Sequence, residues 1–308
     1  MHRKRAKIDH APRVAAQIPV ICIGNLVVGG SGKTPLVASL AEHLIEAGWR
    51  PGIVSRGYGG MARDLPIEVE HDSQPGQVGD EPLMLKRRVG CPVVVCRDRA
   101  RAVDRLHQQH QVNVILSDDG LQNTRLWRDF SVCVFNKDQG IGNGLELPFG
   151  PLREPLNVLE QMDAIVVRGT DYPREMLQAM GIETQTPAFG SISQMAYAYR
   201  SDAPQDRVAL SDLVHRGDWH AVAGIASPNR FFEGLEQAGL SIVEHAFPDH
   251  HRFTDSEIRS LDPMITTEKD AVKLVHLVDR PFWVVALSGQ QSEFEAWLIE
   301  RIEKWSRV

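Results

Sequence analysis

The sequence lacks four features that would place it in common classes of protein. No apolar run approaches the roughly 20 residues that a membrane-spanning helix needs, and no secretory signal is visible. There is no excess of positive charge, because the net charge is −6. There is also no close cluster of cysteine and histidine that would suggest zinc. The composition therefore predicts neither a membrane-spanning chain nor a nucleic-acid-binding one.

Cysteine is scarce, and its positions indicate the environment of the chain. Cys22, Cys91, Cys96 and Cys133 all lie in or beside apolar, strand-like runs. We interpret them as buried thiols in a reducing compartment. The 308 residues are 43% hydrophobic, which suits one large α/β domain or two moderate ones with a real core.

The strongest motif is a glycine-rich turn between a predicted strand and a predicted helix. The apolar run 18–23 is short and partly β-branched, as in a fully covered parallel strand. Glycines then allow a tight turn around an anion. Lys33 follows, with a side chain that can reach the β- and γ-phosphates, and the Thr34 hydroxyl suits Mg²⁺. Pro35 fits the first turn of a helix, whose N-terminus also favours an anion.

We interpret this turn as a nucleotide phosphate-binding loop. The strict pattern asks for glycine where Val27 stands, and Gly24 and Gly29 flank that position instead. The alternative is a chance glycine-rich turn, but the flanking strand and helix and the intact Gly-Lys-Thr favour the loop. The predicted nucleotide-binding residues of the loop are Val27, Val28, Gly29, Gly30, Ser31, Gly32, Lys33 and Thr34.

A second signal is an apolar strand that ends in two carboxylates. The run 112–119 ends in Asp118 and Asp119, and adjacent carboxylates are costly unless a cation or donors compensate them. Nucleotide-binding sheets hold Mg²⁺ with such residues, directly or through water. A plain turn before Gly120 is the alternative. Beside a phosphate loop, the metal-binding interpretation is favoured.

Three other segments carry candidate functional side chains. Arg56 lies in a glycine-rich loop after the predicted strand 52–55, where parallel sheets bind ligands, and could contact phosphate or simply be exposed. Asp80 and Glu81 stand where a loop becomes a helix, so they could cap it or serve as base or metal ligand. The proline-rich stretch 148–155 predicts a stiff loop that holds Arg153 and Glu154.

The chain divides into three predicted parts. Residues 1–17 form a basic N-terminal segment, which either is a solvated terminus or meets anionic lipid headgroups. Residues 18–205 predict a P-loop NTPase-like α/β domain, a parallel sheet flanked by helices. Residues 206–308 have their own α/β rhythm and predict a smaller C-terminal domain, with a capping-box helix start at Thr254 to Glu257.

Seven motifs occur in an order that resembles one family. They are Gly-Asn-(x)4-Gly-x-Gly-Lys-Thr-Pro, Ser-Arg-Gly-Tyr-Gly-Gly, Gly-Asp-Glu-Pro, Asp-Asp-Gly-Leu-Gln, Gly-Pro-Leu-Arg-Glu, Pro-Asp-His-His and Thr-Glu-Lys-Asp-Ala-Val-Lys. From about residue 18 to the end, the chain resembles the tetraacyldisaccharide 4′-kinase (lipid A 4′-kinase) family. The resemblance implies ATP-dependent, Mg²⁺-dependent phosphorylation of the 4′-hydroxyl of a tetraacylated glucosamine disaccharide 1-phosphate.

The resemblance also implies roles for individual residues. Ser31, Lys33, Thr34 and Arg153 would hold the nucleotide, and the metal site would comprise Thr34, Asp118, Asp119 and Glu154. The base would be Asp80, paired with a histidine of the segment 249–251. His250 is favoured over His251 because it directly follows the family's aspartate. Since His250 lies in the second domain, closure of the two domains would assemble the site.

The resemblance implies a partner and a place, and it has two departures. The partners would be the lipid acceptor and an anionic membrane surface, at the cytoplasmic face of a Gram-negative inner membrane.

Where the family usually has histidine, this chain has Asn123, so a catalytic role there is in doubt. The family usually begins with an apolar membrane helix, whereas this chain has the basic segment. We expect either a shortened N-terminus or peripheral attachment by charge and by the acyl chains of the substrate.

Two other functions fit a phosphate loop and an acidic strand end. A switch ATPase or GTPase acting on a protein partner is one. A guanine-specific Asn-Lys-x-Asp would favour GTP, but in the segment 135–139 the aspartate comes one place early. A non-catalytic nucleotide-binding module is the other. Acceptor-dependent ATP turnover separates the kinase from both.

Overall fold

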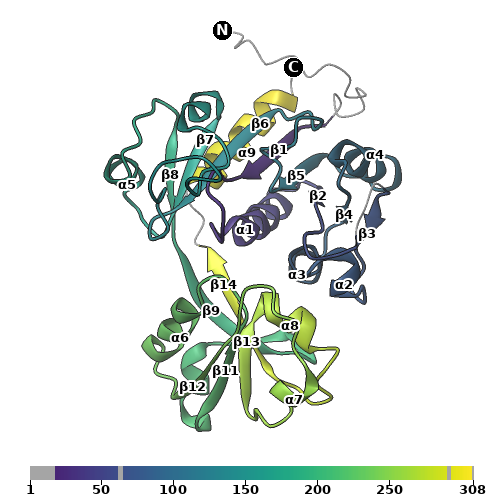
Figure 1. The fold of residues 1–308 in the computed structure, drawn as a ribbon. Coiled ribbons are helices and arrows are strands. Elements are labelled where there is room, and N and C mark those ends of the chain that lie inside the picture. Colours follow the sequence, from purple (N-terminus) through teal and green to yellow (C-terminus); the bar gives the residue numbers. More distant parts are fainter. Residues whose placement is uncertain (1–17, 62–64, 290–292, 307–308) are drawn as a thin grey trace.

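The chain folds into two sheets with helices packed against them (Figure 1). The computed structural model describes residues 18–61, 65–289 and 293–306. The predicted basic segment 1–17 thus lies outside the described residues, apart from which the predicted α/β architecture is confirmed. Among the described helices, none combines the length and apolar character that crossing a bilayer requires.

The larger sheet has eight strands in the order β3-β4-β2-β5-β1-β6-β7-β8. All neighbouring strands in it run parallel except β3 and β4. The strands are β1 (Val20–Gly24), β2 (Pro51–Ser55), β3 (Ile67–Glu68), β4 (Val93–Val95), β5 (Val114–Asp118), β6 (Phe130–Asn136), β7 (Ala164–Arg168) and β8 (Ala188–Ser191). Helices on both faces of the sheet explain why the central strands are apolar along their length.

We call the eight-stranded sheet with its helices the larger unit, and the six-stranded sheet with its helices the smaller unit. The helices of the larger unit cover the two faces of its sheet. One face packs against α1 (Lys33–Glu46), α3 (Asp80–Val89) and α9 (Glu293–Ser306). The other face packs against α4 (Arg99–Gln109), η2 (Leu156–Gln161) and α5 (Pro173–Ala179). The short α2 (Pro75–Val78) precedes α3. All four cysteines are buried and free, which confirms the prediction of buried thiols.

The smaller sheet has six strands in the order β10-β9-β14-β13-β11-β12. Its strands are β9 (Ser193–Arg200), β10 (Ala203–Val208), β11 (Trp219–Ala223), β12 (Ile242–Ala246), β13 (Met264–Thr267) and β14 (Trp283–Gly289). Its helical elements are η3 (Leu210–Arg216), α6 (Pro228–Gln237), α7 (Asp255–Ile258) and α8 (Glu268–Leu274). The capping box predicted at Thr254 is present at the start of α7.

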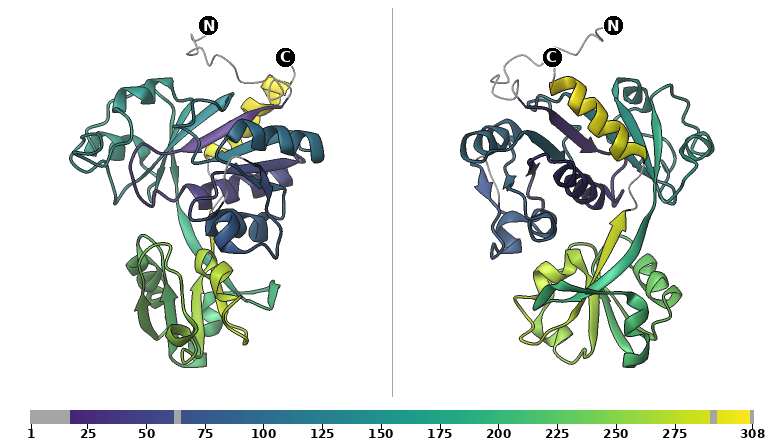
Figure 2. Two further views of the ribbon diagram at one scale, coloured as in Figure 1. Left: turned by 45° about the vertical axis from the view of Figure 1, so that its right-hand side comes forward. Right: turned by 180° about the vertical axis from the view of Figure 1, so that it is seen from behind.

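The division between the two units differs from the predicted ranges 18–205 and 206–308. The larger sheet ends with β8 at Ser191, and β9 of the smaller sheet begins at Ser193. The last helix, α9, returns to the larger unit (Figures 1 and 2), where Phe294, Leu298 and Ile302 join the core of β1 and α1. A sequence pattern shows that such a helix has an apolar face, but not which sheet the face covers.

Candidate active site

The phosphate loop joins β1 to α1 at the carboxyl edge of the larger sheet. Gly29 has φ +115° and Gly32 has φ +76°, backbone conformations that favour glycine. A Cβ on Gly32 would lie 2.0 Å from an Nη1 of Arg168, which donates a hydrogen bond to the Gly32 carbonyl at 2.6 Å. Gly32 therefore serves both the turn and the close approach of the half-buried Arg168.

The departure at Val27 has a structural reason. Val27 is buried and pairs with Leu152 in an isolated bridge, and the Val28 amide donates to the Pro151 carbonyl at 2.9 Å. The loop 148–155 therefore supports the phosphate loop from the side. A glycine would remove the apolar contact of Val27 at this point, and the glycine-rich turn proper begins only at Gly29.

Lys33 is the first residue of α1, and its ammonium lies among oxygen atoms of the loop. Its Nζ is 3.1 Å from Asn25 Oδ1 and 3.4 Å from Ser31 Oγ. It also lies 3.6 Å from Asp119 Oδ1. These contacts hold the positive charge at the helix N-terminus, where an incoming phosphate would meet it.

The two carboxylates at the end of β5 are in different environments. Asp118 is buried, and its Oδ2 accepts a hydrogen bond from the Thr34 hydroxyl at 3.2 Å. Burial, followed by repulsion from Glu81, raises the pKa of Asp118 to about 7. Asp119 contacts Arg153 Nη1 at 3.0 Å. Burial opposes its ionisation, but Lys33 and Arg153 outweigh burial and lower its pKa.

The residues present fit a magnesium ion bound together with a nucleotide. Asp118 Oδ1 is buried and has no hydrogen-bond partner in the described structure, and Thr34 lies beside the same carboxylate. Within the described residues, no three His, Cys, Asp or Glu side chains are arranged to hold a metal by themselves. Mg²⁺ commonly takes one or two carboxylates and completes its shell with phosphate oxygens and water. The structure thus brings Thr34 and Asp118 together.

The other two predicted metal ligands are placed differently from this pair. Asp119 is engaged by two cations, Arg153 and Lys33. Glu154 is half-buried, and among the described residues it makes no hydrogen bond or ion pair. Their assignment as ligands stays a prediction.

Asp80 and His250 meet across the two units. Asp80 is the first residue of α3 and is only 6% exposed, while His250 belongs to the segment between β12 and α7. His250 Nδ1 lies 2.9 Å from Asp80 Oδ2 and 3.2 Å from Oδ1. The hydrogen bond to Asp80 raises the pKa of His250. For Asp80, burial opposes ionisation, but the bond to His250 and the charge of Lys269 outweigh it and lower its pKa.

Lys269, near the start of α8, was not assigned a role from the sequence, although it lies in the quoted Thr-Glu-Lys-Asp motif. Its Nζ is 3.3 Å from His250 Nε2, 2.8 Å from Asp249 Oδ1 and 3.4 Å from Glu81 Oε1. Because Nε2 faces an ammonium and Nδ1 faces a carboxylate, this network assigns the proton of a neutral His250 to Nδ1.

The neighbouring candidates make local contacts instead. His251 contacts Glu257 at 3.2 Å and stacks on Phe247, both in the smaller unit. Asn123 accepts hydrogen bonds from the amides of Arg125 and Leu126 at 3.0 and 3.1 Å, so it caps a turn. Arg56 is exposed at the end of β2, at the same sheet edge as the phosphate loop.

Arg168 is a second residue that the sequence did not single out. It ends β7, is half-buried, and donates hydrogen bonds both to the Gly32 carbonyl and to the hydroxyl of Ser193, where the chain enters the smaller sheet. Burial, with repulsion from Arg88, lowers its pKa to about 10. Its position at the carboxyl end of a strand was a usable signal, but the contacts join residues far apart in sequence.

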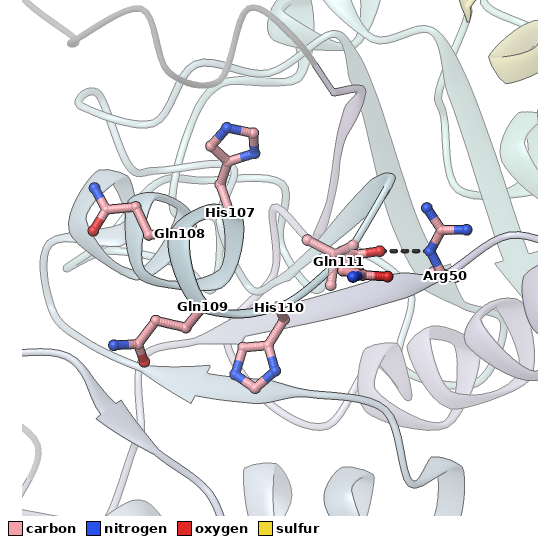
Figure 3. A pocket seen from close by; sticks show the side chains of 7 residues that line it. Arg50, His107, Gln108, Gln109, His110 and Gln111 are labelled. Atoms are coloured by element: carbon pink, nitrogen blue, oxygen red, sulfur yellow. Dashed lines mark hydrogen bonds between the residues drawn. The ribbon is translucent and has the colours of Figure 1, made fainter.

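A hollow of about 300 Å³ lies elsewhere on the larger unit (Figure 3). Its lining includes His107, Gln108 and His110 at the end of α4, and the Arg50 side chain donates to the Gln111 carbonyl at 2.6 Å. This lining lies just before β2 and β5, at the amino edge of the sheet. Ligands of open α/β sheets bind at the carboxyl edge, so the hollow is not the nucleotide site.

Comparison with known proteins identifies the family. The family model described as Tetraacyldisaccharide-1-P 4′-kinase matches residues 1–303. The chain belongs to the tetraacyldisaccharide 4′-kinase family. A Dechloromonas aromatica protein named tetraacyldisaccharide 4′-kinase is 43% identical over 295 residues, covering 95% of this chain and 84% of the relative. A Pseudomonas aeruginosa protein of the same name is 37% identical over 302 residues, covering 95% and 85%.

A solved structure extends the 4′-kinase comparison to the fold. The LpxK of Aquifex aeolicus, crystallised in complex with ATP, superposes with a TM-score of 0.75 at 29% identity. The match covers 92% of this chain and 88% of that one. Membership of the 4′-kinase family does not favour the switch ATPase or GTPase alternative.

Proposed function

We propose that the chain transfers the γ-phosphate of ATP to the 4′-hydroxyl of a tetraacylated glucosamine disaccharide 1-phosphate. The observation that carries the proposal is the contact between Asp80 and His250, at 2.9 Å, across two units that also flank the phosphate loop. A Cβ on Gly30 of that loop would lie 2.8 Å from the Cβ of Ala226 in the smaller unit. Family membership supplies the identity of the acceptor.

The nucleotide side of the reaction depends on positioning and charge. Lys33 and the backbone amides of the loop bind the β- and γ-phosphates, and Ser31 lies beside the lysine. Thr34 and Asp118 would hold Mg²⁺, which neutralises phosphate charge when it is bound. Arg153, which pairs with Asp119 at 3.0 Å, would contact the nucleotide.

The acceptor hydroxyl would be activated by Asp80 and His250, which we call the dyad. A sugar hydroxyl is a weak nucleophile, and Asp80 is the carboxylate that can take its proton as the phosphoryl group transfers. His250 orients that carboxylate through Nδ1, and Lys269 holds the far side of the imidazole at 3.3 Å. Because His250 comes from the smaller unit, the base is fully oriented only when the two units meet.

The direct test is mass spectrometry of the lipid A precursor after incubation with the protein and Mg-ATP. The proposal expects one added phosphate on the disaccharide 1-phosphate and ATP consumption that depends on this acceptor. Lys33→Ala serves as the control for the phosphate loop, with an expected loss of at least about 10²-fold. ATP turnover that is unaffected by the acceptor, with no phosphorylated lipid, would contradict the proposal and favour a switch NTPase.

We also propose that the protein acts at an anionic membrane surface, on the cytoplasmic face of the inner membrane. The support is the basic composition of the N-terminal segment, with Arg3, Lys4, Arg5, Lys7 and Arg13 against Asp9. Co-sedimentation with anionic vesicles should decrease at high salt, because exposed charges are screened within about 10 Å at 0.1 M salt. Unchanged binding after removal of residues 1–13 would reject this segment as the anchor.

A further inference from the structure

An ion-pair cluster joins three helices behind the site. The guanidinium of Arg88, in α3, contacts both carboxylate oxygens of Glu42 in α1, at 2.9 and 3.0 Å. Its remaining Nη1 lies 3.1 Å from Glu268 Oε2, at the first residue of α8. The Arg88 side chain is 6% exposed and that of Glu268 is 10% exposed. One buried guanidinium thus bridges the larger unit and the smaller one.

Each of the three helices carries a group of the proposed site at its N-terminus. Helix α1 begins with Lys33, and α3 begins with Asp80. Helix α8 begins with Glu268, and the next residue is Lys269, which contacts His250 and Glu81. The pairing of Arg88 with Glu268 therefore fixes the helix that presents Lys269 against the helix that presents Asp80.

The charges of Arg88, Glu42 and Glu268 favour keeping these three side chains together. Burial works against charge on Arg88, but the two carboxylates outweigh burial and raise its pKa. For Glu268, burial and the nearby Glu42 outweigh the attraction of Arg88 and raise its pKa. Glu268 is thus a buried acid that accepts a backbone hydrogen bond from Leu287 in its own unit and finds its positively charged partner, Arg88, in the other unit. Separating the units removes that partner, and breaking a buried pair is costly.

We propose that Arg88 is a positioning residue that holds α8 against α1 and α3, and so sets the closed arrangement in which His250 meets Asp80. Its consequence for catalysis rests on the proposed kinase function. Its consequence for the arrangement of the two units does not. The informative variant is Glu268→Gln, because it removes the negative charge that faces Arg88 across the two units and leaves the pairing of Arg88 with Glu42 in place.

The arrangement can be measured without turnover. Gln108 and Glu236 are exposed on the larger and the smaller unit, and the native cysteines are buried, so spin labels on Gln108→Cys and Glu236→Cys report the distance between units. With Mg-ATP bound, we expect Glu268→Gln and Arg88→Gln to broaden and lengthen the distance distribution. Arg259→Gln removes an exposed pair within the smaller unit and should leave it unchanged.

Kinetics supply the second readout. Misplacing a catalytic group from a distance costs rate, so kcat of Glu268→Gln should fall on the order of tenfold to a hundredfold. The affinity for ATP should stay near that of the wild type, since the phosphate loop is untouched. Arg88→Gln should lower kcat in the same way, and Arg88→Lys, which keeps the positive charge, should lower it less. If the wild type fails to phosphorylate the acceptor, the proposed function fails while the distances stand. A folded Glu268→Gln protein with unchanged distances, or with unchanged kcat, overturns the positioning role.

Discussion

At the scale of single residues, Asp118 and Asp119 are adjacent carboxylates in different surroundings, and the pKa of Asp118 is raised by burial. Asp118 lies at the end of a fully buried strand, it has one unpartnered oxygen, and its pKa is raised to about 7. Its neighbour Asp119 faces Lys33 and Arg153, and its pKa is lowered. Two adjacent aspartates are thus given different protonation behaviour by their surroundings.

The first prediction concerns the pH dependence of magnesium activation. With a pKa of about 7, Asp118 is mostly protonated at pH 6 and mostly ionised at pH 8, and a metal must displace its proton. We expect the half-saturating Mg²⁺ concentration to fall by about tenfold from pH 6 to pH 8. Mg²⁺ titrations of the rate should lose this dependence in Asp118→Asn and keep it in Asp119→Asn. Equal pH dependence in both variants would count against Asp118 as the ligand.

The same aspartate affects folding stability. Since the pKa of Asp118 in the folded chain lies above its value of about 3.9 in an unfolded one, folding favours the protonated form. Its stabilising contribution is complete below about pH 4 and lost as pH rises through 7. Without metal or nucleotide, Asp118→Asn should therefore melt above the wild type at pH 8, and the difference should shrink towards pH 5. Calorimetry that finds no gain at pH 8 would contradict this account.

At the scale of elements, the phosphate loop has a glycine, Gly32, that combines a positive φ angle with a close contact to the Arg168 side chain. Gly32 and Gly48 have similar φ angles, +76° and +84°, but different surroundings. Around Gly48 nothing lies within 4 Å of an added Cβ, whereas at Gly32 the Arg168 guanidinium lies at 2.0 Å. The two glycines therefore separate the cost of the backbone conformation from the cost of the contact.

We expect Gly48→Ala to cost only about 1 kcal/mol of stability and to leave ATP binding intact. Gly32→Ala should displace Arg168 and the start of α1, and so weaken ATP binding by at least about tenfold. Calorimetric titration with ATP and thermal melts of both variants supply the comparison. Equal ATP affinity in the two variants would show that Arg168 yields without disturbing the loop.

The elements also show what the sequence reveals and what it does not. Strands β1, β5, β6 and β7 follow from short apolar runs, because burial on both faces demands them. The order of the strands, the passage from β8 to β9 and the return of α9 depend on contacts between distant segments. The same holds for the site: Lys33 follows from a local motif, whereas Arg168 and Arg88 act through residues over 100 positions away.

At the scale of the whole molecule, variants of Asp80 and His250 test whether the two units act together, because each unit supplies one of these residues. A cap lost from Asp80 would cost about 1 kcal/mol of stability and spare the chemistry, whereas a general base contributes roughly 10²–10⁴-fold in rate. We expect Asp80→Ala and His250→Ala each to lose kcat in this range while the protein stays folded and binds ATP. Their effects should not add in the double variant.

The matched control for the dyad is His251→Ala, since His251 contacts Glu257 within the smaller unit. It should keep most of the activity. A folded Asp80→Ala protein with near-normal kcat would remove Asp80 as the base, and would direct the search to Glu81.

The return of α9 to the larger sheet has a consequence during synthesis on the ribosome. The apolar side chains of Phe294, Leu298 and Ile302 complete a core that begins at Ile21. The whole smaller sheet, 193–289, is made before them. The smaller unit can therefore finish folding first, although most of the larger unit precedes it in the chain. Until α9 emerges, the nascent larger unit exposes the apolar face that α9 will cover, and an exposed apolar face makes a folding chain prone to aggregation.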